Sequence, residues 1–255
     1  MMTRPTPGTG GSAADFIPPR PTLSKLRAAA ANCRGCDLWK VGTQTVFGEG
    51  PRTARVLVVG EQPGDQEDKE GKPFVGPSGR LLDKAFDAAG IAREDVYVTN
   101  AVKHFKWARD SRTKRRIHKT PNAAEIRACF PWLQAEIAMI KPEVIVCLGA
   151  TAAKALLGRA FSVVKMRGIA VESEWARAVI ATVHPSAVLR APREERKRSE
   201  RAFIADIRRV ARHLEHANNG GESGRRAATS RRLAAWQITD QPSATSSEST
   251  RSSRK

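Results

Sequence analysis

The sequence predicts an α/β protein, a three-layer α/β/α sandwich around a central, mainly parallel sheet of four strands. Apolar residues run continuously through four short segments, at 55–60, 95–102, 143–149 and 178–183. Such runs are typical of strands that are buried on both faces. Helical patterns separate them, and strands that alternate with helices form parallel sheets covered by helices. A chain of 255 residues with 40% hydrophobic content can bury such a core.

The helices expected between these strands span residues 78–90, 121–140 and 150–158, and a last helix begins near residue 193. Thr120 is the expected N-cap of the second helix, with Pro121 at its first helical position. Residues 103–119, which precede it, form a 17-residue connection. Connections of this length in compact domains are usually functional or disordered.

Both ends of the chain have the composition of disordered segments. Residues 1–22 are rich in Pro, Gly and Thr and contain no apolar run of the kind that a secretory signal requires. Residues 217–255 are rich in Ser, Thr, Gly and Arg and lack apolar periodicity. We therefore expect a folded domain over residues 23–216 between a disordered leader and a disordered basic tail. No segment approaches the roughly 18 apolar residues of a membrane span, so we expect no membrane contact and a cytoplasmic location.

The charge of the chain indicates a polyanionic partner. A formal net charge of +18 attracts polyanions by long-range steering, and nucleic acids also by counterion release. The excess is concentrated in residues 102–119, which contain eight Lys or Arg and one Asp. This part of the chain is expected to be a contact surface.

Polar residues follow three of the predicted strands. The segment GEQPGDQEDKEGKPFVG leaves the first strand, Asn100 ends the second, and HPSAVLR leaves the fourth. Ligands of open parallel sheets bind beyond the carboxyl ends of the strands, so these segments are the expected site. The basic connection contains TKRRIHKT, in which His118 is either a bystander to phosphate binding or a reactive group.

The chain has four cysteines, and their spacing leaves several roles open. Cys33 and Cys36 form a Cys-x-x-Cys pair, whereas Cys129 and Cys147 stand alone. Four such thiolates can bind zinc, hold a [4Fe-4S] cluster, or in part be ordinary core thiols. Cys147 is the weakest candidate ligand because it lies inside an apolar strand.

Taken together, the motifs resemble a known family. GE-x-PG, PF-x-G, an Asn at the end of the next strand and a terminal HPS resemble the iron-sulfur uracil-DNA glycosylases, often called family 4, over roughly residues 23–212. Two features depart from that family: Gln62, where Ala or Gly is usual, and the inserted KRRIH. Both resemble the UdgX branch, which excises uracil and then traps the DNA covalently through the His of KRRIH.

The resemblance implies a fold, a cofactor and a substrate. The fold is that of the uracil-DNA glycosylases, and the cofactor is a [4Fe-4S] cluster on Cys33, Cys36, Cys129 and Cys147. The substrate is uracil-containing DNA, with single-stranded DNA favoured. We also expect the protein to act as a monomer.

The chemistry of uracil excision assigns a role to each candidate side chain. Phe74 offers a flat face on which an extruded base can stack. The Asn100 amide can accept a hydrogen bond from uracil N3–H and donate one to uracil O4. Cytosine has the opposite arrangement of donor and acceptor at these two positions. His184, followed by Ser186 of the HPS motif, can donate a hydrogen bond to uracil O2 as negative charge develops. Glu61 corresponds to the family's carboxylate beside the sugar, where it can stabilise a cation or act as a base.

The remaining polar residues near these motifs are assigned more broadly. Gln62, Asp65, Glu67 and Asp68 are candidate substrate-binding residues, although the three acidic ones also fit a solvated turn. Glu67 aligns with a family residue that excludes the thymine methyl group. Lys114, Arg115 and Arg116 are expected to hold DNA phosphates without reading sequence.

His118 is the expected nucleophile for the sugar carbon that loses uracil, because a neutral imidazole can attack an oxocarbenium ion. Its neighbouring cations are expected to favour the neutral form, and Glu61 is expected to accept its proton. Three alternatives remain open: a turnover glycosylase that uses water, a noncatalytic iron-sulfur DNA-binding module, and a zinc-stabilised scaffold.

Overall fold

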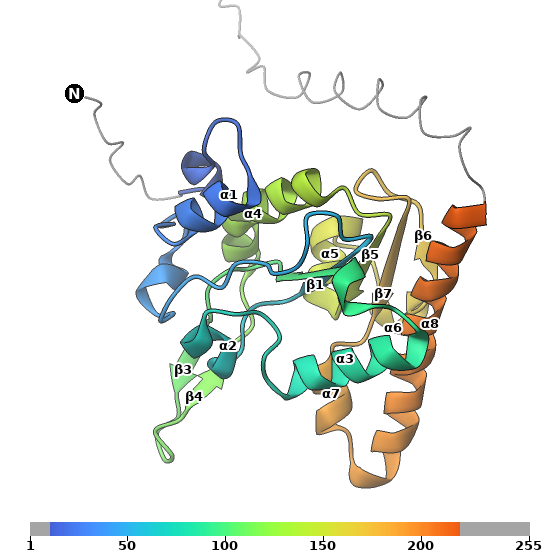
Figure 1. The fold of residues 1–255 in the computed structure, drawn as a ribbon. Coiled ribbons are helices and arrows are strands. Elements are labelled where there is room, and N and C mark those ends of the chain that lie inside the picture. The colour runs from blue at the N-terminus through green and yellow to red at the C-terminus, as the bar shows by residue number, and fades with distance from the viewer. Residues whose placement is uncertain (1–10, 220–255) are drawn as a thin grey trace, which may run out of the picture. The chain divides into compact units, whose positions relative to one another are not determined.

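The computed structural model describes residues 11–219, with side chains described as far as Glu215. Within this part of the chain, the main sheet has five strands in the order β2-β1-β5-β7-β6 (Figure 1). Four are parallel: β1 (Val56–Gly60), β2 (Val96–Asn100), β5 (Val144–Leu148) and β7 (Ala178–Thr182). The fifth, β6 (Ala170–Val171), pairs antiparallel with β7. The predicted parallel strands are confirmed, but β6 was missed because two residues leave no readable pattern.

Helices cover both faces of this sheet, which confirms the three-layer sandwich. One face packs against α3 (Pro77–Ala89), α7 (Pro185–Arg190) and α8 (Arg193–Asn219). The other packs against α4 (Ala123–Ile140), α5 (Ala150–Leu157) and α6 (Val163–Met166). Successive residues of β1 alternate between the two cores, with Val56 and Val58 in the first and Leu57 and Val59 in the second. Burial on both faces explains the continuous apolar run.

An N-terminal layer packs against α4. It consists of η1 (Ala13–Phe16), α1 (Leu23–Ala30) and η2 (Asp37–Lys40). Ala13, Leu26 and Leu38 join Trp132 of α4 in a third apolar cluster. The predicted disordered leader is therefore wrong for residues 11–22, because tertiary packing buries Ala13 and partly covers Phe16 and Ile17. Residues 1–10 lie outside the described residues.

Three connections contain short elements that the sequence did not reveal. The segment after β1 contains α2 (Asp65–Glu70), and η3 (Arg93–Asp95) precedes β2. The basic connection forms an antiparallel hairpin of β3 (Trp107–Arg109) and β4 (Arg116–His118), in which Trp107 pairs with His118. The N-cap of α4 is Asn122 rather than the predicted Thr120, because Asn122 and Glu125 form a reciprocal capping box.

The C-terminal boundary lies close to the predicted one. One compact unit extends to Glu215, and α8 continues to Asn219. The rest of the predicted tail, residues 220–255, lies outside the described residues. In the described part of the chain, no helix is both long and apolar enough to cross a membrane.

Candidate active site

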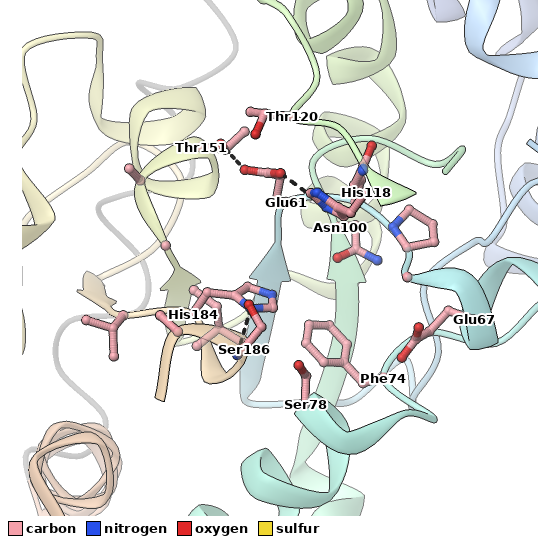
Figure 2. A pocket seen from close by; sticks show the side chains of 18 of the residues that line it. Glu61, Glu67, Phe74, Ser78, Asn100, His118, Thr120, Thr151, His184 and Ser186 are labelled. Carbon is pink, nitrogen blue, oxygen red and sulfur yellow. Dashed lines mark hydrogen bonds and ion pairs between the residues drawn. The ribbon is translucent and has the colours of Figure 1, made fainter. Parts of the chain in front are cut away.

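A pocket of about 470 Å³ opens at the carboxyl ends of the parallel strands. Its walls come from the segments that follow β1, β2, β5 and β7, as expected for a parallel sheet. The pocket brings together eight of the ten predicted catalytic and substrate-binding residues: Glu61, Gln62, Glu67, Phe74, Asn100, His118, His184 and Ser186. All of these except Gln62 are labelled in Figure 2. Residues separated by more than a hundred positions thus form one site.

Asn100 and Phe74 lie together above the end of β1. A Cβ atom on Gly60 would lie 2.3 Å from Asn100 Oδ1 and 2.9 Å from the Phe74 ring, so glycine allows both side chains to approach. Phe74 adopts a φ of 58°, an uncommon conformation for a bulky residue and one often found at functional sites. Among the described residues, the Asn100 side-chain amide has no hydrogen-bond partner. Its donors and acceptor are therefore available to a ligand.

Glu67 closes the loop that carries Phe74. Its Oε1 accepts a hydrogen bond of 2.9 Å from the backbone N–H of Gly76, and its side chain is buried at the pocket wall. Glu67 thus shapes this side of the pocket.

His184 is the N-cap of α7, which orients its ring. Nδ1 lies 3.2 Å from the backbone N–H of Ser186 and 2.8 Å from Ser186 Oγ. A ring nitrogen that accepts from both groups leaves the ring proton on Nε2. Burial, supported by the charge of Arg190, lowers the pKa of His184 to about 4. The ring is therefore a neutral hydrogen-bond donor at neutral pH.

Glu61 connects His118 to α5. Its Oε1 lies 3.4 Å from His118 Nε2, and its Oε2 accepts a hydrogen bond from the Thr151 hydroxyl (Figure 2). Burial lowers the pKa of His118, the Glu61 carboxylate raises it, and Arg190 lowers it further. The net shift is downward, so the imidazole is neutral at pH 7. Burial and Arg190, rather than the cations of the basic run, account for this shift.

The polar atoms of the Gln62 side chain all form hydrogen bonds with the hairpin segment. Its Nε2 donates to the backbone oxygens of Lys106 and Lys119, both at 3.1 Å. Its Oε1 accepts from the Lys106 N–H at 3.0 Å. The side chain therefore joins both ends of the hairpin segment that contains His118. These contacts indicate a positioning role, whereas the predicted contact of Gln62 with substrate stays a prediction, since this residue also lines the pocket.

Arg116 and two acidic residues form a second connection to the hairpin. Arg116 bonds to Asp65 through Nε and to Asp68 through Nη1, the latter at 2.6 Å. Asp68 is fully buried and also accepts from the Thr43 N–H at 2.9 Å. Asp65 and Asp68 lie outside the pocket lining, so their predicted contact with substrate is wrong. Arg116 was also predicted to bind phosphate, but its charge is already paired with Asp65 and Asp68.

The other two cations of the basic run fit the prediction better. Lys114 and Arg115 are exposed, and their side chains have no ion-pair partner within the described residues. They are available to phosphates.

Three of the cysteines gather between the N-terminal layer and α4. Cys33, Cys36 and Cys129 influence one another electrostatically, and burial raises the pKa of Cys129 to about 12. The Trp132 indole donates to Cys33 Sγ at 3.3 Å, and the Lys103 N–H donates to Cys129 Sγ at 3.2 Å. Donors of this kind suit thiolate ligands, so these three cysteines fit a cluster in part.

Cys147 does not join the other cysteines. It lies in β5 and packs in the sheet core beneath α4 and α5, whereas Cys33 and Cys129 belong to the third cluster. Its predicted role as a fourth ligand is wrong, because β5 places its side chain among apolar residues. Among the described residues, no complete group of three or more His, Cys, Asp or Glu is arranged to hold a metal ion.

Sequence reasoning missed three residues around these sites. Thr151 is 90 positions from the Glu61 that it binds, and nothing local marks it. Arg190 lines the pocket at the end of the HPSAVLR segment, where its basic character was the available signal. His104 is buried beside Thr45, at 3.0 Å from Nε2 to the hydroxyl, and follows the Lys103 that contacts Cys129. Nothing in the local sequence marked His104, because it stands beside a Lys within the basic run.

The fold and pocket define a class of protein: a parallel α/β sandwich that can enclose a planar polar ring between an amide, an aromatic face and neutral imidazoles. Comparison with known proteins gives the family. Residues 47–208 match the Uracil DNA glycosylase superfamily, and the chain belongs to it.

Similar curated proteins are named Type-4 uracil-DNA glycosylase. The Thermotoga maritima protein is 41% identical over 167 residues, covering 65% of this chain and 82% of the relative. The Pyrobaculum aerophilum protein is 38% identical over 177 residues, covering 67% and 86%. The Archaeoglobus fulgidus protein is 38% identical over 183 residues, covering 68% and 87%.

Proposed function

We propose that this protein excises uracil from DNA, with single-stranded DNA favoured, and then captures the DNA covalently through His118. The glycosylase activity is supported by the family and by the names of the relatives. The observation that carries the capture step is the contact between His118 Nε2 and Glu61 inside the pocket.

The pocket floor selects the base. Uracil extruded from the strand stacks on Phe74, and the free Asn100 amide accepts from N3–H and donates to O4. Cytosine offers the opposite hydrogen-bond pattern, so it leaves the buried amide unsatisfied. Glu67 and its loop hold Phe74 and restrict space beside the ring.

Excision breaks the bond between uracil N1 and the sugar C1′. The bonding electron pair leaves with uracil, and the sugar becomes an oxocarbenium-like cation. The neutral Nε2–H of His184 donates to O2 as charge develops there, and the Glu61 carboxylate stabilises the cation. A low pKa suits His184 to this donor role because the ring stays neutral.

Capture follows at the opposite wall. The neutral His118 ring carries its proton on Nε2. Glu61 Oε1 accepts this proton, and the electron pair of the broken N–H bond forms the bond between Nε2 and C1′. The products are neutral imidazole attached to the sugar, protonated Glu61 and the uracil anion, which can then take up a proton. Atoms and charges balance without any further reactant.

An ordinary turnover reaction is the alternative, in which a water beside Glu61 attacks the same carbon. The position of His118 Nε2 next to Glu61 favours capture, because it places an imidazole nitrogen beside the carboxylate that would otherwise activate water.

The decisive test is His118→Ser with single-stranded DNA that contains one uracil. We expect the wild-type protein to give one adduct per DNA molecule on a denaturing gel. The variant should form no adduct but should release uracil repeatedly, because excision depends on Glu61, Asn100 and His184. Repeated turnover by the wild type without an adduct would establish the water reaction instead. No uracil release by either protein would contradict both.

A [4Fe-4S] cluster on Cys33, Cys36 and Cys129 also belongs to this proposal. Such a cluster would link the N-terminal layer to α4, on which the hairpin segment ends. We propose His104 as the fourth ligand, because it is buried directly after Lys103, whose backbone N–H contacts Cys129 Sγ, and because histidines replace cysteines in other clusters.

The ligand assignment predicts different iron contents for two cysteine variants. Cys129→Ala should lose bound iron and the brown visible absorbance, whereas Cys147→Ala should keep both, because Cys147 packs in the sheet core. Iron assay and absorbance of proteins purified without oxygen measure this directly. Loss of iron from Cys147→Ala with an unchanged unfolding temperature would refute the assignment.

A further inference from the structure

A second groove lies between α4 and α5, next to the active site. It has a volume of about 750 Å³, and Ala123, Ile126, Arg127 and Phe130 of α4 form one side. Ala150, Thr151, Lys154 and Ala155 of α5, together with Arg159, form the other. Apolar side chains thus form part of a groove that three cations border.

The charge of this groove is not neutralised. Arg127, Lys154 and Arg159 are exposed, and within residues 11–215 none of them has an ion-pair partner. The lining contains no acidic residue. These three cations are scattered along the sequence and lie outside the basic run at 102–119. The fold therefore creates a second cationic surface that the sequence pattern did not show.

The groove is continuous with the active-site pocket. Ala150 and Thr151, in the first turn of α5, line both. Thr151 also binds the Glu61 carboxylate that contacts His118. Lys154 lies one turn after Thr151 on the same helix face. A strand that leaves the pocket over the first turn of α5 therefore enters this groove directly.

We propose that the α4–α5 groove binds the single DNA strand on one side of the target nucleotide. Arg127, Lys154 and Arg159 hold its phosphates, and Phe130 and Ile126 offer apolar surface to a base. This inference rests on the proposed function, which it extends from the extruded nucleotide to its neighbours.

The dimensions and chemistry of the groove fit this occupant. The eight residues of α5 extend about 12 Å, which matches the rise of three to four stacked nucleotides. Cationic grooves with aromatic side chains are typical of proteins that bind single strands without reading sequence. Phe130 is half-buried, and its edge-on contact with Trp175 fixes the ring. A preformed apolar wall needs little ordering when a base packs against it.

The test compares two variants that lose the same charge. The groove variant combines Arg127→Gln, Lys154→Gln and Arg159→Gln. The control combines Lys197→Gln, Arg198→Gln and Arg201→Gln on α8, which covers the opposite face of the sheet. Binding is measured by fluorescence anisotropy over a range of salt concentrations. The probe is a single-stranded oligonucleotide in which thymine replaces uracil, so no excision occurs.

We expect the slope of log affinity against log salt to fall by about 2 in the groove variant, at about 0.7 for each lost phosphate contact. The α8 control should keep a slope close to that of the wild type. With uracil-containing DNA and protein in excess, the groove variant should need a higher protein concentration for half-maximal release of uracil in a single turnover. Its maximal single-turnover rate should be unchanged, since Glu61, Asn100 and His184 are intact. Unfolding temperatures of both variants should match the wild type, because all six side chains are exposed.

Equal slopes for the groove variant and the α8 control would overturn the inference. So would a fall in the maximal single-turnover rate with an unchanged half-saturating protein concentration. The failure of the proposed function looks different: the wild type would release no uracil, while the difference in salt slope between the two variants would still report strand binding in the groove.

Discussion

Asn100 and His118 face the same pocket but are held in place by different parts of the structure. Asn100 ends a fully buried strand, and the parallel sheet fixes its position. His118 ends an exposed hairpin strand, which is held through Gln62 and through the ion pairs of Arg116. Apolar burial therefore positions the group proposed to read the base, and polar contacts position the proposed nucleophile. Base excision and covalent capture should accordingly respond to different mutations.

The largest effect is expected from Asn100→Asp on the sheet side. The carboxylate loses the amide donor to uracil O4, so uracil release and capture should fall together by about 100-fold or more. Single-turnover release of uracil and adduct yield, measured in the same samples, check this. Affinity for DNA without uracil should not change. A loss of capture with normal uracil release would show that the two regions do not divide the reaction as described.

A smaller and more selective effect is expected from Gln62→Ala on the hairpin side. Removing the three hydrogen bonds of this side chain lets the hairpin shift, and small misplacements of a reacting group cost about 10-fold to 100-fold in rate. The adduct should form more slowly by this factor, while uracil release should stay within about threefold of the wild type. Arg109→Gln, an exposed change on the same hairpin, is the matched control. Equal losses in both reactions would contradict a positioning role.

The smallest effect is expected from pH. The pKa of His118 is lowered, so its neutral form persists below the ordinary value of about 6.5 and is lost only in more acidic solution. The fraction of released uracil that leads to an adduct should be constant from pH 8 to about pH 6.5 and should fall below that range. Arg190→Gln removes one cause of the lowering, so the fall should begin at a higher pH. A fall that begins above pH 7 in the wild type would contradict the direction of the shift.

The contrast between a pocket wall built by the sheet and a hairpin held by polar contacts also explains how much of the site could be predicted from the sequence. The four parallel strands were readable because burial on both faces leaves continuous apolar runs, and Asn100 and His184 follow from where those strands end. Phe74 and Glu61 follow from a motif beside the first strand. The local sequence therefore predicted the side of the pocket that the sheet builds.

The polar contacts of the hairpin were not readable, because their partners are distant in the sequence. Gln62 binds residues 44 and 57 positions away, and Arg116 binds acids 51 and 48 positions away. Cys147 was misassigned for a related reason: the number of cysteines was visible, but the face of β5 on which this one lies was not. Pairing across the fold is a tertiary property that composition and spacing do not encode.

The connections of Gln62 and Arg116 also bear on how the proposed covalent capture could be transferred between proteins. A turnover glycosylase that receives only the KRRIH insertion would gain an imidazole without the side chains that fix the hairpin to the loop after the first strand. The transferable unit comprises five residues on two segments: Gln62, Asp65 and Asp68 on one, and Arg116 and His118 on the other. Grafting both segments together should install the trap, whereas either segment alone should leave an enzyme that still releases its DNA.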